Sequence, residues 1–225
     1  MSAMDNTTAG GTEPATGDAA PAKRPPATSP DTAGADYAER LRTLEGVWWK
    51  RLLNVQAPYR WNLRRLHLGR TLDVGCGIGR NLLNLGPDSV GVDHNPDSVA
   101  TARARGLRAY TVEEFLASEY AKLGAFDSML VAHVVEHMSE ADAKGVVGMY
   151  LDYLRPGGRV LFITPQERGF ASDHTHVRFC GFEEVAALAR DLGLTVERQY
   201  SFPFPRWMGK VFTYNEFNVL ARKPE

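Results

Sequence analysis

The sequence predicts an α/β fold: a doubly wound, Rossmann-like sheet of seven strands, mostly parallel, with one antiparallel strand near the C-terminus. Three observations predict it. Short apolar runs alternate with amphipathic stretches from residue 70 onward, which is typical of parallel strands joined by helices. A glycine-rich turn, Gly75 to Gly79, follows the first apolar run. The last two strand-like runs leave no room for a helix between them, so they should pair as antiparallel neighbours.

The composition predicts how the chain divides into an N-terminal tail and one folded domain. The 225 residues, 44% of them apolar, suffice for one sizeable core. Residues 1–36 are dominated by Ala, Thr, Pro and Gly, which predicts a disordered tail because such a segment buries too little surface to offset its ordering entropy. Residues 37–225 should form one domain. The net charge of -1, the two cysteines and the lack of a long apolar run lead us to expect a soluble cytoplasmic protein that binds neither nucleic acid nor membrane.

The domain should begin with a helical cap. From Asp36 to about Leu68, apolar residues recur at spacings of three and four, and Pro58 should break or kink the helix. The recurring residues are Leu41, Leu44, Val47, Trp48, Leu52 and Val55.

The remaining elements follow in alternation. The expected strands are residues 70–74, 89–93, 107–110, 126–132, 158–165, 194–202 and 214–222. The expected helices are residues 80–85, 96–105, 112–120, 139–154 and 181–192. Ser139 is a good N-cap for the helix that it begins, and Pro156 and Gly157 should stop that helix. Residues 203–210 are expected to be a surface loop.

The glycine turn and the acidic residue after the next strand predict a nucleotide site. Gly75, Gly77 and Gly79 permit a tight turn and let a ligand approach the backbone. Asp93 ends the following strand, where its carboxylate can accept hydrogen bonds from both ribose hydroxyls. A cluster of turn glycines with a helix-capping Asp is the structural alternative.

These segments resemble a known family. LDVGCGIGR followed by GVD looks like the first two motifs of class I methyltransferases that use S-adenosylmethionine, and FDSMLVAHVVEHM and LRPGGRVLFITP resemble later motifs. The resemblance covers roughly residues 55–222. It implies that S-adenosylmethionine is the cofactor, with Asp73 and the three glycines at its methionine moiety and Asp93 at its ribose.

Further cofactor contacts are implied by the same resemblance. Glu113 occupies a place where the family often has an acidic side chain near the adenine. Arg60 resembles an arginine that some ubiquinone-pathway O-methyltransferases place on the cofactor carboxylate, although a solvated helix residue is an equal alternative. His94 and Ala132, at the ends of the second and fourth strands, complete the expected set.

The stretch AHVVEHM contains three side chains that could bind a metal ion. If a helix begins after the fourth strand, His133, Glu136 and His137 share one face at the carboxyl edge of the sheet. Two groups of metal-dependent methyltransferases, those of the ubiquinone pathway and those of small-RNA 3′ ends, have the similar motif Glu-x-x-Glu-His at this position. The set here could hold Mg²⁺ or Mn²⁺, with the extra imidazole favouring Mn²⁺ or Zn²⁺. A purely structural Glu-His pair is the alternative.

A base or a further ligand should come from the loop after the fifth strand, PQERGFASDHTHVRF. His176 and His174 lie there, and with His133 they are the candidate catalytic residues. Solvated loop histidines are the alternative.

The methyl acceptor is expected to be small. The segments WWKRLLNVQAPYRWNLRRL, DVGCGIGRN and ASDHTHVRF together resemble the methyltransferases of methylmannose polysaccharide biosynthesis. This resemblance implies O-methylation of a sugar hydroxyl, such as the 1-hydroxyl of a mannoside, with help from a divalent metal. An O-methyltransferase for a quinone precursor or another phenol is a second reading, and a non-catalytic cofactor-binding partner subunit is a third. The expected partner is therefore a small molecule or oligosaccharide, and a homodimer stays open.

Overall fold

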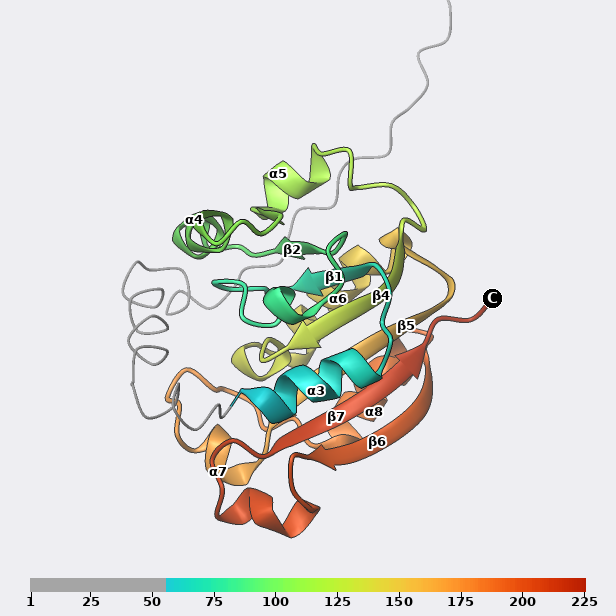
Figure 1. The fold of residues 1–225 in the computed structure, drawn as a ribbon. Coiled ribbons are helices and arrows are strands. Elements are labelled where there is room, and N and C mark those ends of the chain that lie inside the picture. Colours follow the sequence, from blue (N-terminus) through green and yellow to red (C-terminus); the bar gives the residue numbers. More distant parts are fainter. Residues whose placement is uncertain (1–55) are drawn as a thin grey trace, which may run out of the picture.

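The computed structural model describes residues 56–225, which form a seven-stranded sheet in the order β3-β2-β1-β4-β5-β7-β6 (Figure 1). The strands are β1 (Thr71–Val74), β2 (Val90–Val92), β3 (Ala109–Tyr110), β4 (Phe126–Ala132), β5 (Leu154–Pro165), β6 (Thr195–Phe202) and β7 (Glu216–Arg222). Pairing is parallel from β3 through β5, whereas β7 runs antiparallel to both β5 and β6. The predicted fold class, including the antiparallel strand, is confirmed.

Six helices join or flank the strands of the described chain. They are α3 (Ala57–Arg65), α4 (Pro96–Ala104), α5 (Val112–Leu116), α6 (Glu140–Tyr150), α7 (Glu167–Phe170) and α8 (Phe182–Asp191). Short 3₁₀ turns lie at η2 (Leu82–Asn84), η3 (Val135–His137), η4 (Leu151–Tyr153) and η5 (Arg206–Lys210). The helix starts follow from capping: the side chains of Asn95, Thr111 and Ser139 accept hydrogen bonds from first-turn amides of α4, α5 and α6.

Several elements differ from the sequence expectation. The helix expected over residues 80–85 is only the turn η2, and the one expected over 139–154 ends as an α-helix at Tyr150. The loop 203–210 contains η5, and α7 was not expected. Pro58 lies in the first turn of α3, where its missing N–H is not needed. The rest of the expected cap and the expected disordered tail lie outside the described residues.

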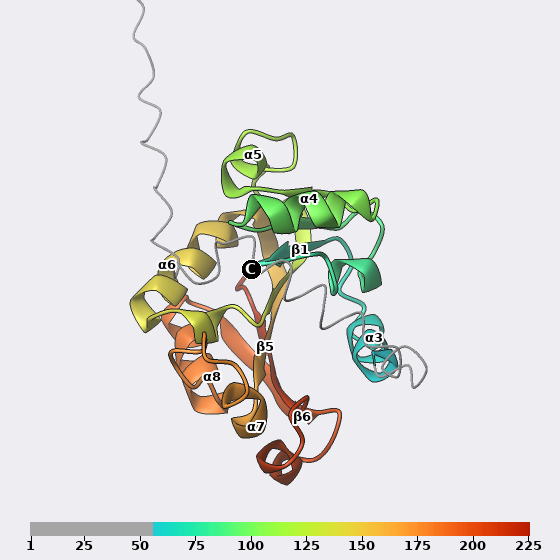
Figure 2. The same cartoon turned by 90° about the vertical axis from the view of Figure 1, so that its left-hand side faces the viewer.

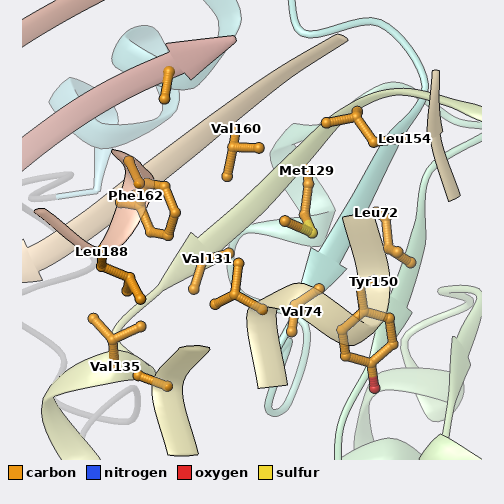
Figure 3. Close-up of a cluster of buried hydrophobic side chains, with 14 of the residues drawn as sticks. Leu72, Val74, Met129, Val131, Val135, Tyr150, Leu154, Val160, Phe162 and Leu188 are labelled. Atoms are coloured by element: carbon orange, nitrogen blue, oxygen red, sulfur yellow. The ribbon is translucent and has the colours of Figure 1, made fainter. Parts of the chain in front are cut away.

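Side chains alternate between the two faces of the sheet, and helices cover both faces. In β4, Met129 and Val131 point into a large core that includes residues of α6 and α8 (Figure 3). The intervening Leu130 and Ala132 pack with Leu63 of α3 on the opposite face. Figure 2, which views the sheet from the end where β1 and β4 finish, shows α3 on one side and α6 and α8 on the other.

No helix within residues 56–225 has both the length and the apolar character needed to cross a bilayer. This finding agrees with the sequence, which lacks a long apolar run.

The packing beneath α3 gives a stability prediction. Leu130→Ala should lower the free energy of unfolding by about 2–5 kcal/mol, because the side chain is fully buried between β4 and α3 and its removal leaves a cavity. Leu123→Ala, the same change at a side chain that is 79% exposed, should stay within about 0.5 kcal/mol. Urea unfolding of both variants measures the difference, and equal losses would contradict this packing.

Candidate active site

The turn after β1 is built from glycines in left-handed conformations. Gly75, Gly77 and Gly79 have φ angles of 73°, 52° and 83°, which side chains rarely adopt. A Cβ atom at Gly75 would collide with the side chain of Val134, and one at Gly79 with Leu107. The glycines are therefore required by backbone shape and by close packing.

Asp93 ties the end of β2 to this turn. Its Oδ2 accepts a hydrogen bond from the backbone N–H of Gly77 at 2.7 Å, and its Oδ1 accepts one from the N–H of Asn95 at 2.8 Å. The His94 Nδ1 atom lies 3.6 Å from Asp93 Oδ1. Each carboxylate oxygen has a further lone pair, so Asp93 can still accept hydrogen bonds from a ligand.

The carboxyl group of Asp73, in β1, is buried and is not fully hydrogen-bonded within the described chain. It is 1% exposed, and its Oδ2 has no hydrogen-bond partner among residues 56–225. Burial, and then the negative charge of Asp93, raise the pKa of Asp73 to about 8. The carboxyl groups of Asp73 and Asp93 thus lie near each other beside the glycine turn, and a positively charged ligand bound there would lower the pKa of Asp73 again.

The other expected cofactor residues lie on several different elements of the described chain. Glu113 is exposed in the first turn of α5, and its charge and that of Asp93 both help to raise the pKa of the buried Tyr150. Ala132 ends β4 and is buried. Arg60 is half-buried in α3.

His133 is held between two carboxylates. Its backbone is left-handed, with φ of 58°, and its Nδ1 lies 3.3 Å from Glu136 Oε1 while its Nε2 lies 3.0 Å from Glu216 Oε1. Removal from bulk water lowers its pKa, but the hydrogen bonds and charges of Glu136 and Glu216 outweigh that effect and raise the pKa to about 10. His133 therefore carries a proton at neutral pH when both carboxylates face it.

Glu136 is a fully buried acid. Apart from the nearby His133 ring, neither of its carboxylate oxygens has a hydrogen-bond partner within the described chain. Burial raises its pKa, but His133 and the charge of His137 outweigh burial, so the net shift of the pKa is downward. An ionised, buried and weakly compensated carboxylate is costly, and it is a strong attractor for a cation.

Glu136, His137 and His176 form a group that could hold a metal ion. One possible ligand atom from each of the three side chains lies within 4.8 Å of the others. The two imidazole rings are adjacent, with centroids 4.8 Å apart. Burial is the main cause that lowers the pKa of His137, which keeps this ring neutral and able to ligate.

Hydrogen bonds orient both rings. His137 Nδ1 lies 3.2 Å from the carbonyl oxygen of Thr175, and His176 Nδ1 lies 2.8 Å from the carbonyl oxygen of Phe170. Because a carbonyl only accepts, both Nδ1 atoms donate, and each Nε2 keeps its lone pair. The Thr175 hydroxyl, 3.1 Å from His137 Nδ1, donates in turn to Asp173 Oδ1 at 2.8 Å.

Most of the polar residues expected at the carboxyl edge of the sheet thus lie close together, but they pair differently from the sequence expectation. His176 joins Glu136 and His137 in the candidate metal group, whereas His133 pairs with Glu136 and Glu216 instead. His174 is exposed. Sequence reasoning missed Glu216 and Thr175. Glu216 could have been found, since an antiparallel strand begins at the edge where its parallel neighbours end.

Comparison with known proteins identifies the family. A family model described as a methyltransferase domain matches residues 49–205. The chain belongs to this methyltransferase family. The ribosomal protein L11 methyltransferase of Ralstonia pickettii is 32% identical over 144 residues, which cover 61% of this chain and 43% of that relative. The methyltransferase therefore spans less than half the length of that relative.

Solved structures share the fold at low sequence identity. Magnesium protoporphyrin IX methyltransferase of Synechocystis PCC 6803, with bound S-adenosylhomocysteine, is 13% identical with a TM-score of 0.59, covering 86% of this chain and 97% of that one. The N-methyltransferase NodS of Bradyrhizobium japonicum is 19% identical with a TM-score of 0.56, covering 74% and 95%. A methyltransferase of Archaeoglobus fulgidus described as dependent on S-adenosylmethionine is 18% identical with a TM-score of 0.55, covering 73% and 93%. These likenesses establish the fold of this methyltransferase.

The raised pKa of Asp73 gives a pH-dependent prediction. Between about pH 4 and pH 8, the folded methyltransferase keeps a proton on Asp73 that the unfolded chain releases, so the stability contribution of Asp73 falls as the pH rises. Asp73→Asn removes this titration. It should raise the free energy of unfolding by an amount that grows with pH and levels off above pH 8, on the order of 5 kcal/mol.

Thermal unfolding from pH 4 to pH 9 measures this effect, with Asp88→Asn as the matched control because the Asp88 side chain is 73% exposed. A stability gain for Asp73→Asn that does not change with pH would contradict the raised pKa.

Proposed function

We propose that this methyltransferase moves the methyl group of S-adenosylmethionine to a hydroxyl of a sugar, such as the 1-hydroxyl of a mannoside unit in polysaccharide biosynthesis, with help from a divalent metal ion. The observation that carries the proposal is the environment of Glu136. Apart from the His133 ring at 3.3 Å, the oxygens of this buried carboxylate have no hydrogen-bond partner among the described residues. The carboxylate lies beside two histidines whose Nδ1 atoms already donate. Such a donor set fits a metal ion.

The cofactor would lie along the glycine turn. S-adenosylmethionine carries a positive sulfonium and a positive ammonium group, which the Asp93 carboxylate would attract. Their charge would also lower the raised pKa of Asp73 and favour its ionised form. Gly75, Gly77 and Gly79 would bring bare backbone against its methionine moiety, and Asp93 would accept hydrogen bonds from its ribose. Glu113, His94, Ala132 and Arg60 complete the proposed cofactor contacts. Methyltransferase family membership supports this assignment.

Glu136, His137 and His176 are the proposed metal ligands, with His176 in place of His133. One carboxylate and two imidazoles favour Mn²⁺ over Mg²⁺, since Mg²⁺ prefers a shell of oxygen ligands. When bound, the ion would act as a Lewis acid that lowers the pKa of the acceptor hydroxyl.

His133 is the proposed proton acceptor. Glu216 fixes the ring through Nε2, and Nδ1 faces the proposed metal group through Glu136. The side chain is 43% exposed, so an acceptor can reach it. Once Glu136 serves as a ligand, Nδ1 loses its carboxylate partner and can take the hydroxyl proton, with Glu216 stabilising the resulting imidazolium. His174, which is exposed, has no part in this arrangement.

A sugar acceptor would account for a metal group and a proton acceptor at the same site. An aliphatic hydroxyl is a far weaker acid than a phenol, whose pKa is about 10, so it depends more strongly on a base or a metal. Transfer itself requires mainly that donor and acceptor be aligned in a cleft from which water is excluded.

An acceptor panel tests the proposal. Labelled S-adenosylmethionine would be incubated with mannosides, glucosides and phenols, with and without EDTA. Metal-dependent labelling of a glycoside is the expected result. Metal-independent labelling of phenols would assign the protein to phenolic acceptors, and cofactor binding without any methylation would make it a non-catalytic partner.

The metal group gives a prediction that does not depend on turnover. His176→Ala and Glu136→Gln should each weaken Mn²⁺ binding at least tenfold, because each removes one of three proposed ligands. His174→Ala, a change at an exposed histidine two residues away, should bind Mn²⁺ like the parent protein. Titration calorimetry or manganese electron paramagnetic resonance measures this. Unchanged Mn²⁺ binding in both ligand variants would remove the proposed metal centre.

A further inference from the structure

The loop after β5 is tied to η3, the turn that carries two of the three proposed metal ligands. The backbone N–H groups of Val177 and Arg178 both donate to the carbonyl oxygen of Glu136, at 2.9 and 3.2 Å. The same loop supplies His176, the third proposed ligand. Residues 173–178 therefore hold η3 in place and also contribute to the metal group.

A chain of hydrogen bonds runs from His137 into this loop. The Nδ1 atom of His137 lies 3.2 Å from the carbonyl oxygen of Thr175 and 3.1 Å from the Thr175 hydroxyl oxygen. Because the carbonyl can only accept, Nδ1 carries the proton, and the hydroxyl must give its own proton to another acceptor. It donates to Asp173 Oδ1 at 2.8 Å. The chain therefore has one direction, from the imidazole through the hydroxyl to the carboxylate.

The middle of this chain is shielded from water. Thr175 is 4% exposed and Asp173 is half-buried, whereas His174 between them is exposed. The backbone N–H of Thr175 also donates to Asp173 Oδ1, at 3.1 Å. A buried hydroxyl needs an acceptor within the protein, and the carboxylate of Asp173 provides it.

The two imidazoles of the metal group differ in what accepts their Nδ1 proton. His176 donates to the backbone carbonyl of Phe170, which is a neutral group. His137 donates to a backbone carbonyl and to a hydroxyl that is itself bonded to a carboxylate. The sequence DHTH thus contains more than a ligand, because Asp173 and Thr175 act on the neighbouring turn.

We propose that Asp173 is a positioning residue for the metal centre and acts on His137 through the Thr175 hydroxyl. A hydroxyl that donates to a carboxylate is a stronger acceptor for the Nδ1 proton, and this raises the electron density at Nε2 of the same ring. The bond to Asp173 also fixes the rotation of the hydroxyl, so the ring is held in one orientation. The inference rests on the proposed function, in which Nε2 of His137 binds the ion.

A purely structural role for Asp173 would be to shape the loop. Its Oδ1 accepts from both the N–H and the hydroxyl of Thr175, and its carbonyl oxygen accepts from the His176 N–H at 3.3 Å. The change Asp173→Asn keeps a side-chain oxygen for the first two bonds and leaves the backbone bond untouched, but it removes the negative charge. This variant therefore separates the charge of Asp173 from the shape of the loop.

Titration of the full-length protein with Mn²⁺ tests the chain. Asp173→Asn and Thr175→Val should each weaken Mn²⁺ binding about tenfold, whereas Thr175→Ser, which keeps the hydroxyl, should bind like the parent. The double variant should bind no more weakly than Thr175→Val alone, because without the hydroxyl Asp173 no longer reaches His137. Glu140→Gln is the control for lost negative charge, since Glu140 is exposed in the first turn of α6, and its Mn²⁺ binding should be unchanged.

Nuclear magnetic resonance of the metal-free protein gives a second readout. In the parent, the proton on Nδ1 of His137 should exchange slowly with water. Its resonance should shift in Asp173→Asn and Thr175→Val, and it should stay in place in Thr175→Ser and Glu140→Gln. A role limited to shaping the loop would leave the resonance of Asp173→Asn where the parent has it.

Equal Mn²⁺ binding by Asp173→Asn and the parent would overturn the inference and leave the proposed metal centre intact. Losses that add in the double variant would also overturn it, because Asp173 would then act on the ion through space. A parent protein that binds no Mn²⁺ would contradict the metal centre itself and the role of Asp173 with it. The expected Mn²⁺ affinities without methylation of any sugar would instead contradict the proposed acceptor and leave this inference standing.

Discussion

The parallel pairing of β4 with β1 and β5 is the constraint on which the candidate site depends. In a parallel sheet all strands finish at the same edge, so the glycine turn after β1, Asp93 after β2 and His133 after β4 are brought to one place. The antiparallel β7 begins at that edge and adds Glu216. Residues far apart in the sequence therefore meet because of strand direction and order.

The same edge holds two buried carboxyl groups whose oxygens are incompletely hydrogen-bonded within the described chain. Asp73 and Glu136 are buried carboxyl groups with unpartnered oxygens, whereas the faces of the sheet beside them are closely packed and apolar. Burying such groups costs stability that the core must offset. Proteins tolerate this cost where a ligand supplies the missing charge, and both carboxyl groups call for a positively charged one.

Features that depend on short-range sequence patterns could be predicted from the sequence. Contacts between residues that are far apart in the chain could not. The glycine turn and the position of Asp93 follow from short-range spacing, and the alternation of apolar runs predicted all seven strands. The metal set was reasoned from an α-helix over residues 133–137. The chain instead forms a 3₁₀ turn after a left-handed His133, which directs that ring toward Glu216. The sequence favours His176 over His174, since the apolar residue after His176 can anchor it, but no pattern in the sequence reveals the contact of its ring with Phe170.

A crystal structure of the protein with S-adenosylmethionine tests the central claim most directly. The ligand should follow the backbone of residues 75–79, with both ribose hydroxyls within hydrogen-bonding distance of the Asp93 carboxylate and a positive group of the ligand facing Asp73. A glycine turn left empty at saturating ligand, or one occupied by a dinucleotide in preference to S-adenosylmethionine, would contradict it.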